Sequence, residues 1–198
     1  MTSPRAAHEN PYWSEYAKSH VFDPVEIEDL CCIGFNTIQA TRNLSTLWIA
    51  EELEEGEPPH WEYPLLVALH QRSAEEELSG ILLKLAIAYR ALDDQLSDHE
   101  PFLVFREAQF ASFGSFLTVY SEDKIRDSLR EACNKIIHAE DLRVTYNHND
   151  EDDEKRVWYM TNTVELQGRF GRKEWMVSIQ LLHFFEAMLE TVQFTSTP

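Results

Sequence analysis

Four polar residues at four-residue intervals could carry out acid–base chemistry on a phosphodiester. Arg126, Arg130, Asn134 and His138 recur at this spacing, and a helix of about 3.6 residues per turn keeps such side chains on one slowly drifting line. Arginine neutralises charge on phosphate, an amide orients an oxygen, and imidazole moves a proton near neutral pH. A solvated helix face with a C-terminal capping histidine gives the same pattern, because the helix dipole favours imidazolium there.

A helix from Ser121 to about Ala139 must position these residues. An apolar stripe lies beside the polar line and predicts that the helix packs on a core. Cys133 falls on this stripe, and a buried cysteine ordinarily acts as a small hydrophobe. We do not expect it to be a nucleophile, because a reactive thiol needs a base and an electropositive pocket. The stripe contains Ile125, Leu129, Ala132, Cys133, Ile136 and Ile137.

The segment Leu129 to His138, with the sequence LREACNKIIH, resembles the signature helix of HEPN-domain proteins. That helix typically carries an arginine, a polar residue that is often asparagine, and a histidine after a gap of four to six residues. Asn134, Lys135, Ile136 and His138 match the pattern, and Gly80 to Leu85 also resembles bacterial members. Cys133 stands where the family places its arginine, and a cysteine lacks the planar, positively charged fork that holds a phosphate.

The resemblance implies a compact helical bundle, often dimeric, that in active members is a metal-independent endoribonuclease of a toxin–antitoxin or phage-defence system. In such enzymes the 2′-hydroxyl of the RNA attacks the adjacent phosphate at the dimer interface. His138 would then be the general acid and base, Asn134 would position the phosphate or the 2′-hydroxyl, and Arg130 would stabilise the charge. Arg126 and Lys135 would contact RNA. No cofactor is expected.

The alternative is a catalytically degenerate HEPN-like module for interaction or dimerisation, or an acidic protein that binds a basic partner. Cys133 favours this alternative. The charge of −18, from 35 acidic and 17 basic side chains, also favours it because such a surface repels phosphate backbones unless basic residues are locally concentrated. A small RNA-cutting pocket within an acidic surface remains compatible with this charge.

The chain of 198 residues, 43% of them hydrophobic, is long enough to bury one core without disulfides or metals. We expect an N-terminal arm over residues 1–22 and one HEPN-like domain over residues 23–198. The three cysteines include no CxxC pair, which is typical of a reduced compartment. Neither a signal peptide nor a membrane span is expected, so the predicted location is the cytoplasm, with no membrane partner.

Periodicity predicts an α+β fold that is mainly helical, a bundle of four or five helices with a small antiparallel β element near residues 142–178. Capping signals start helices at Asp23 and Ser73. The expected helices are 23–54, 73–98, 121–139 and 181–192. The expected extended segments are 101–105, 142–146, 156–166 and 175–179.

No metal site is expected. His183 and Glu186 share one face of the last predicted helix, but they do not complete a known ligand pattern. The same holds for a set near the end of the second helix: Asp93, Asp94, Asp98 and His99. The acidic loop at residues 149–154 lacks the glycine and terminal glutamate of an EF-hand. A solvated hairpin tip explains this loop better.

Overall fold

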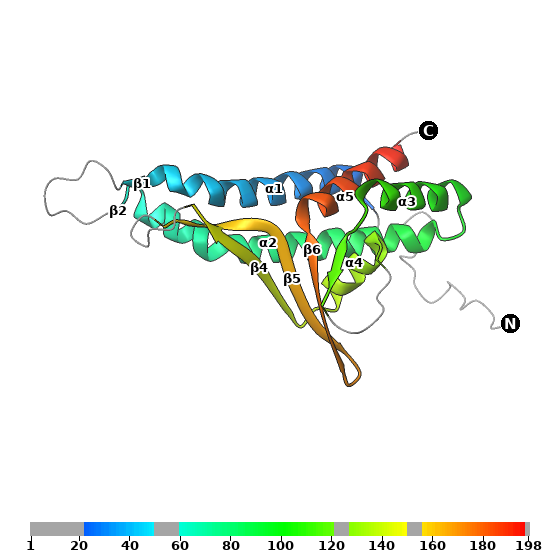
Figure 1. The fold of residues 1–198 in the computed structure, drawn as a ribbon. Helices are drawn as coiled ribbons and strands as arrows, with labels where there is room; N and C mark the ends of the chain where they lie inside the picture. The colour runs from blue at the N-terminus through cyan, green and yellow to red at the C-terminus, as the bar shows by residue number, and fades with distance from the viewer. Residues whose placement is uncertain (1–21, 50–59, 121–126, 150–155, 197–198) are drawn as a thin grey trace, which may run out of the picture.

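The computed structural model describes residues 22–49, 60–120, 127–149 and 156–196 (Figure 1). Within these ranges, five α-helices accompany a four-stranded antiparallel sheet and a two-stranded ladder, which confirms the mainly helical α+β class. The expected N-terminal arm lies outside the described residues except for Phe22, which packs against the main core. The tip of the acidic loop, residues 150–155, is also outside them.

Helix α1 (Pro24–Asn43) begins where the capping signal predicts. Asp23 accepts a hydrogen bond from the Val25 N–H at 3.0 Å, and proline suits the first turn because it lacks an N–H to satisfy. The expected extension to residue 54 is wrong: a 3₁₀ turn (Leu44–Leu47) follows α1.

A small second core explains this early end of α1. Leu44 is buried there with Val67 and Val157, and Leu47 packs against them. Strand β1 (Trp48–Ile49) then pairs antiparallel with β2 (His60–Trp61). Tertiary packing therefore overrides the helical periodicity of this segment.

Helix α2 (Pro64–Gln95) is continuous over 32 residues. Its predicted start at Ser73 is wrong, because the Ser73 hydroxyl lies inside the helix and donates to the Leu69 carbonyl at 3.0 Å. The capping-box sequence is therefore present without acting as a cap. In Figure 1, α2 runs antiparallel to α1 along the length of the molecule.

Helix α3 (Glu100–Phe113) replaces the extended segment expected at residues 101–105. Pro101 lies in its first turn, a position where proline favours a helix. The helix ends at Gly114, whose positive φ of 75° suits a glycine. Strand β3 (Leu117–Val119) follows.

Helix α4 (Leu129–Ile137) starts at the Ser128 cap, which accepts from the Glu131 N–H at 3.1 Å. It is shorter than the predicted helix from 121 to 139, of which residues 121–126 lie outside the described part. After it come the strands of the predicted β element and the closing helix, which runs beyond its expected end at 192. These are β4 (Asp141–His148), β5 (Trp158–Phe170), β6 (Lys173–Gln180) and α5 (Leu181–Ser196).

The sheet has the order β3-β6-β5-β4, and every neighbouring pair is antiparallel. The β5–β6 hairpin projects away from the helices in Figure 1. Gly168 of β5 allows a close approach to α4, because a Cβ there would lie 2.8 Å from the His138 carbonyl oxygen. The sheet therefore supports the C-terminal end of α4.

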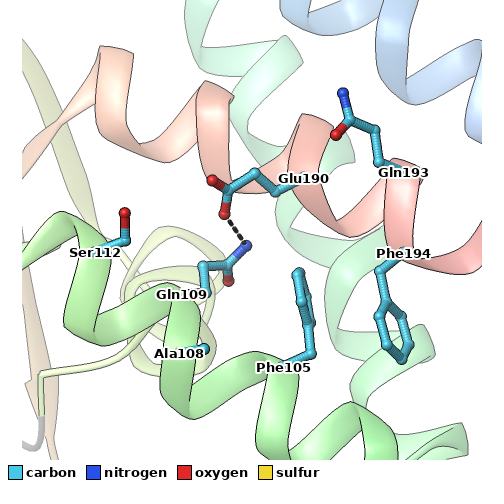
Figure 2. A pocket seen from close by; sticks show the side chains of 7 residues that line it. All are labelled: Phe105, Ala108, Gln109, Ser112, Glu190, Gln193 and Phe194. Atoms are coloured by element: carbon cyan, nitrogen blue, oxygen red, sulfur yellow. Dashed lines mark hydrogen bonds between the residues drawn. The ribbon is translucent and has the colours of Figure 1, made fainter.

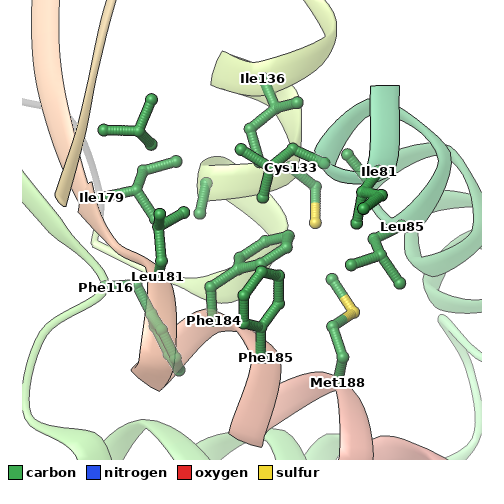
Figure 3. Close-up of a cluster of buried hydrophobic side chains, with 14 of the residues drawn as sticks. Ile81, Leu85, Phe116, Cys133, Ile136, Ile179, Leu181, Phe184, Phe185 and Met188 are labelled. Atoms are coloured by element: carbon green, nitrogen blue, oxygen red, sulfur yellow. The ribbon is translucent and has the colours of Figure 1, made fainter. Parts of the chain in front are cut away.

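The main core joins the sheet to the inner faces of α1, α2, α4 and α5. Figure 3 shows Phe184, Phe185 and Met188 of α5 beside Cys133 of α4 and Leu85 of α2. All five side chains are buried. Helix α5 thus fills the space between helices that precede it in the sequence.

Candidate functional site

Helix α4 presents two distinct faces. Its inner face buries Leu129, Ala132, Cys133 and Ile136 against the core. Cys133 is fully buried, and burial raises the pKa of its thiol well above the usual range. The prediction that Cys133 is a core residue is confirmed. A buried, protonated thiol is a poor nucleophile.

Arg130, the proposed charge-stabilising residue, is bound to two carboxylates of α2. Its guanidinium forms an ion pair with Asp93 and donates to Asp94 Oδ1 at 2.7 Å. Burial lowers the pKa of Arg130, and the neighbouring Arg90 lowers it further. The guanidinium therefore has acidic partners inside the protein.

Two further arginines complete a group that we call the Asp93 cluster: Arg90, Asp93, Asp94, Arg106 and Arg130. Arg106 Nη1 donates to Asp93 Oδ1 at 2.7 Å, and Arg90 Nη1 lies 3.7 Å from Asp93 Oδ2. The Asp93 side chain has no exposed surface. Three arginines and two aspartates leave a formal charge of +1, so the cluster neutralises most of its own charge.

The sequence alone did not indicate that the residues of the Asp93 cluster come together. Asp93 follows Ala86, Tyr89 and Leu92 on the buried face of α2, where a charged residue is expected only with partners. A charged residue on this buried face was the one feature of the sequence that could have indicated a buried ion pair. Two of the partners, Arg106 and Arg130, come from α3 and α4, and their convergence on α2 depends on tertiary structure.

The remaining predicted residues lie along the outer side of α4. Asn134 Nδ2 donates to Glu131 Oε2 at 3.0 Å. Lys135 Nζ lies 3.5 Å from Glu131 Oε1 and 4.3 Å from the ring centroid of Trp175, an arrangement that favours a cation–π contact. Both side chains thus have partners within the protein.

His138 is the C-cap of α4, and its backbone N–H donates to the Asn134 carbonyl at 3.0 Å. Its side chain is exposed. It lies eight positions after Arg130, which corresponds to a rise of about 12 Å along the helix axis at 1.5 Å per residue. The two residues are therefore about two turns apart, and the Arg130 guanidinium is bound to Asp93 and Asp94. Arg126 lies outside the described residues.

A hollow of about 420 Å³ lies between α3 and α5, as Figure 2 shows. Gln109 spans it and donates to the Ala187 carbonyl at 2.9 Å and to Glu190 Oε2 at 3.2 Å. Phe105 and Phe194 stack with their centroids 4.6 Å apart. Because these polar and aromatic groups already bind one another, the hollow is better explained as a joint between two helices.

A second hollow, of about 350 Å³, lies between α1 and α5, and we call it the α1–α5 groove. Among the described residues its lining is mostly apolar, with two glutamates as the only charged members. Among the described residues, no lysine or arginine lines it. It is lined by Glu28, Cys31, Cys32, Phe35, Leu182, Phe185, Glu186 and Leu189.

The described residues offer neither a metal-binding cluster nor a membrane-spanning helix. No group of three or more His, Cys, Asp or Glu side chains is placed to hold a metal ion. None of the described helices has the length and apolar character needed to cross a bilayer. Asp93 and Asp94, considered above as metal ligands, bind arginines in this structure.

Comparison of the chain with protein-family models, with curated proteins and with solved structures finds no match.

Proposed function

We propose that this protein is a HEPN-like interaction module of a bacterial or phage conflict system that does not cleave RNA. The observation that carries the proposal is the state of α4 at the position of the motif arginine. Cys133 occupies that position and is fully buried. A thiol in the core can neither contact an RNA phosphate nor supply the charged donors that the reaction requires.

The nearest arginine does not compensate for this loss. Arg130 lies one turn earlier and binds Asp93 and Asp94. To reach a phosphate, it would have to leave a buried carboxylate without one of its partners, which is costly. The net charge of −18 further disfavours RNA, whereas it favours association with a basic protein.

Two finer features of the proposal, a HEPN-like helical bundle and a homodimer, follow from the resemblance of residues 129–138. A third, the cytoplasmic location, follows from the cysteine usage. The antiparallel pair α1 and α2, with α5 packed on α1, is compatible with such a bundle. Sedimentation of the purified chain tests the dimer: a monomeric mass at all concentrations contradicts it.

A ribonuclease assay tests the central proposal. Wild-type protein and His138→Ala are incubated with single-stranded RNA in the presence of EDTA, and we expect no cleavage by either. His99→Ala is the matched control, because His99 is another exposed histidine and lies outside α4. Cleavage by wild type and His99→Ala, lost in His138→Ala, would overturn the proposal.

That same outcome would establish the second candidate, a metal-independent endoribonuclease. One observation favours it: the His138 side chain is exposed at the end of α4, where RNA can reach it. In this function His138 is the general acid and base, Asn134 positions the substrate and Arg130 stabilises charge. Lys135 and Arg126 contact the RNA. In the HEPN-like arrangement, the arginine and histidine of two copies meet at the dimer interface, so a second copy completes the site.

A further inference from the structure

The α1–α5 groove is built as a trough between two helices. The lining residues of α1 lie at positions 28, 31, 32 and 35, and those of α5 at 182, 185, 186 and 189. These three- and four-residue steps place each set on one face of its helix, over about two turns. Two such ridges form the kind of surface into which the side chains of a third helix pack.

The floor of the groove is fixed by close packing. Gly34 of α1 faces Phe185 of α5 so closely that a Cβ on Gly34 would lie 2.7 Å from Cζ of the ring. The Cys31 thiol faces the Phe185 carbonyl at 3.8 Å. Both Cys31 and Phe185 are almost fully buried. The floor is therefore rigid and apolar, while the walls remain accessible.

The walls expose apolar surface to solvent. Phe35 is 45% exposed although it is a large aromatic residue, and Leu182 and Leu189 are only partly buried. A volume of about 350 Å³ falls within the range of ligand-binding hollows, about 300–1,000 Å³. An apolar side chain that entered the groove would be removed from water at no cost in unpaired polar groups on these walls.

The rim carries negative charge that the described protein does not neutralise. Glu28 and Glu186 are exposed, and among the described residues no lysine, arginine or histidine forms an ion pair with either of them. Both carboxylates contribute to the raised pKa of Cys31, which is about 12 and results mainly from burial. The potential inside the groove is therefore negative.

We propose that the α1–α5 groove binds an amphipathic, basic helix of a partner protein. The apolar face of that helix lies against Phe35, Leu182 and Leu189, and its lysines or arginines pair with Glu28 and Glu186. This inference deepens the interaction role proposed above and rests on it. Apolar burial supplies the affinity of such a helix-in-groove complex, and charge complementarity selects a basic partner.

Binding of a synthetic helix tests the inference. The probe is a fluorescein-labelled peptide of about 16 residues, or four turns, with leucines at steps of three and four and lysines elsewhere. A second peptide carries glutamate in place of each lysine. Fluorescence anisotropy at about 0.15 M salt limits long-range attraction. We expect saturable binding of the lysine peptide alone. Absence of binding, or equal binding of both peptides, overturns the inference.

Paired variants locate the binding. The double variant Glu28→Lys, Glu186→Lys should weaken affinity at least about tenfold, because two charge pairs become repulsive. Its control is Glu107→Lys, Glu174→Lys, which changes the net charge equally at exposed positions outside the groove. Control affinity should stay within about threefold of wild type. Equal losses in both double variants would show attraction to overall charge and would overturn the groove as the site.

A second pair tests the apolar contact. Phe35→Ala should weaken binding, whereas Phe170→Ala, which removes an 84% exposed ring at the β5–β6 hairpin, should not. Thermal unfolding verifies that each variant is folded. The two proposals fail separately. If the lysine peptide does not bind and no ribonuclease activity is seen, only the groove as a binding site is contradicted. If His138-dependent cleavage is seen, the proposed non-catalytic function is contradicted.

Discussion

The charged residues of the Asp93 cluster are paired within the protein, whereas those of the α1–α5 groove face the solvent. In the cluster, a buried aspartate is surrounded by three arginines from α2, α3 and α4. In the groove, two exposed glutamates border an apolar hollow and have no cationic partner among the described residues. The ion pairs of the cluster therefore hold three helices together, whereas the glutamates of the groove are available for the partner helix proposed above.

The largest expected effect tests the structural role of the cluster. Asp93→Asn keeps the shape of the side chain but leaves three arginines without their central carboxylate, so we expect a loss of about 3–5 kcal/mol in the free energy of unfolding. Urea denaturation measures it. Asp94→Asn is the control, because Asp94 is 58% exposed and should cost below about 1 kcal/mol. If both variants lost only a little free energy of unfolding, the Asp93 cluster would not hold the helices together as described.

A smaller effect tests the floor of the groove. Gly34→Ala should destabilise the protein by about 1–3 kcal/mol, because its Cβ would clash with the Phe185 ring. Gly80→Ala is the matched control within α2: nothing lies within 4 Å of a Cβ there, and alanine should stabilise the helix by up to about 1 kcal/mol. Thermal unfolding separates the two. A stabilising Gly34→Ala would mean that α1 and α5 are less tightly packed than described.

The buried thiols predict a dependence of stability on pH. Burial raises the pKa of Cys31 from 9.0 to about 12 and raises that of Cys133 as well. Above about pH 9 the unfolded chain loses these protons while the folded chain keeps them, so the free energy of unfolding falls with rising pH. The slope is up to about 1.4 kcal/mol per pH unit for each thiol. Urea unfolding from pH 8 to 10 should show a shallower slope for Cys133→Ala; an unchanged slope contradicts this.

The smallest expected effect concerns the chemical reactivity of the cysteines at the groove and behind the Asp93 cluster. Cys32 is exposed on the groove, whereas Cys31 and Cys133 are buried. Brief treatment of the native protein with iodoacetamide should therefore modify Cys32 alone, and denatured protein should be modified at all three. Mass spectrometry of peptides identifies the sites. Native modification of Cys133 would show that the core behind the Asp93 cluster opens readily.

Local signals predicted the fold where a single face of a segment meets the core. Alternation indicated β4 and β5, a third extended segment was expected at 175–179 where β6 lies, and the amphipathic pattern of residues 181–192 indicated α5. Helix boundaries were less predictable. The capping box at Ser73 is overridden because the buried face of α2 continues on both sides of it, from Val67 to Leu78. Pro101 lies in the first turn of α3, where an extended segment was predicted.

The sequence predicted the burial of Cys133 and the polar line on α4, but it did not predict the partners of that line. Asp93 lies 37 residues before Arg130, and only the packing of α4 on α2 brings them together. The groove was still harder to predict from the sequence, since Cys31 and Phe185 are 154 residues apart. Such pairs have no local sequence signature, because their contact depends on the path of the whole chain.

The separation of α1 and α5 along the chain affects the order in which their shared core can form during synthesis. The inner face of α1 is made early, but Phe185, which covers it, is translated 154 residues after Cys31. At about 5–20 residues per second, the interval is roughly 8–30 s. Throughout that time the apolar side chains of α1 and α2 lack their final partner. A nascent chain that stalls before Leu181 therefore presents an uncovered core to the cell.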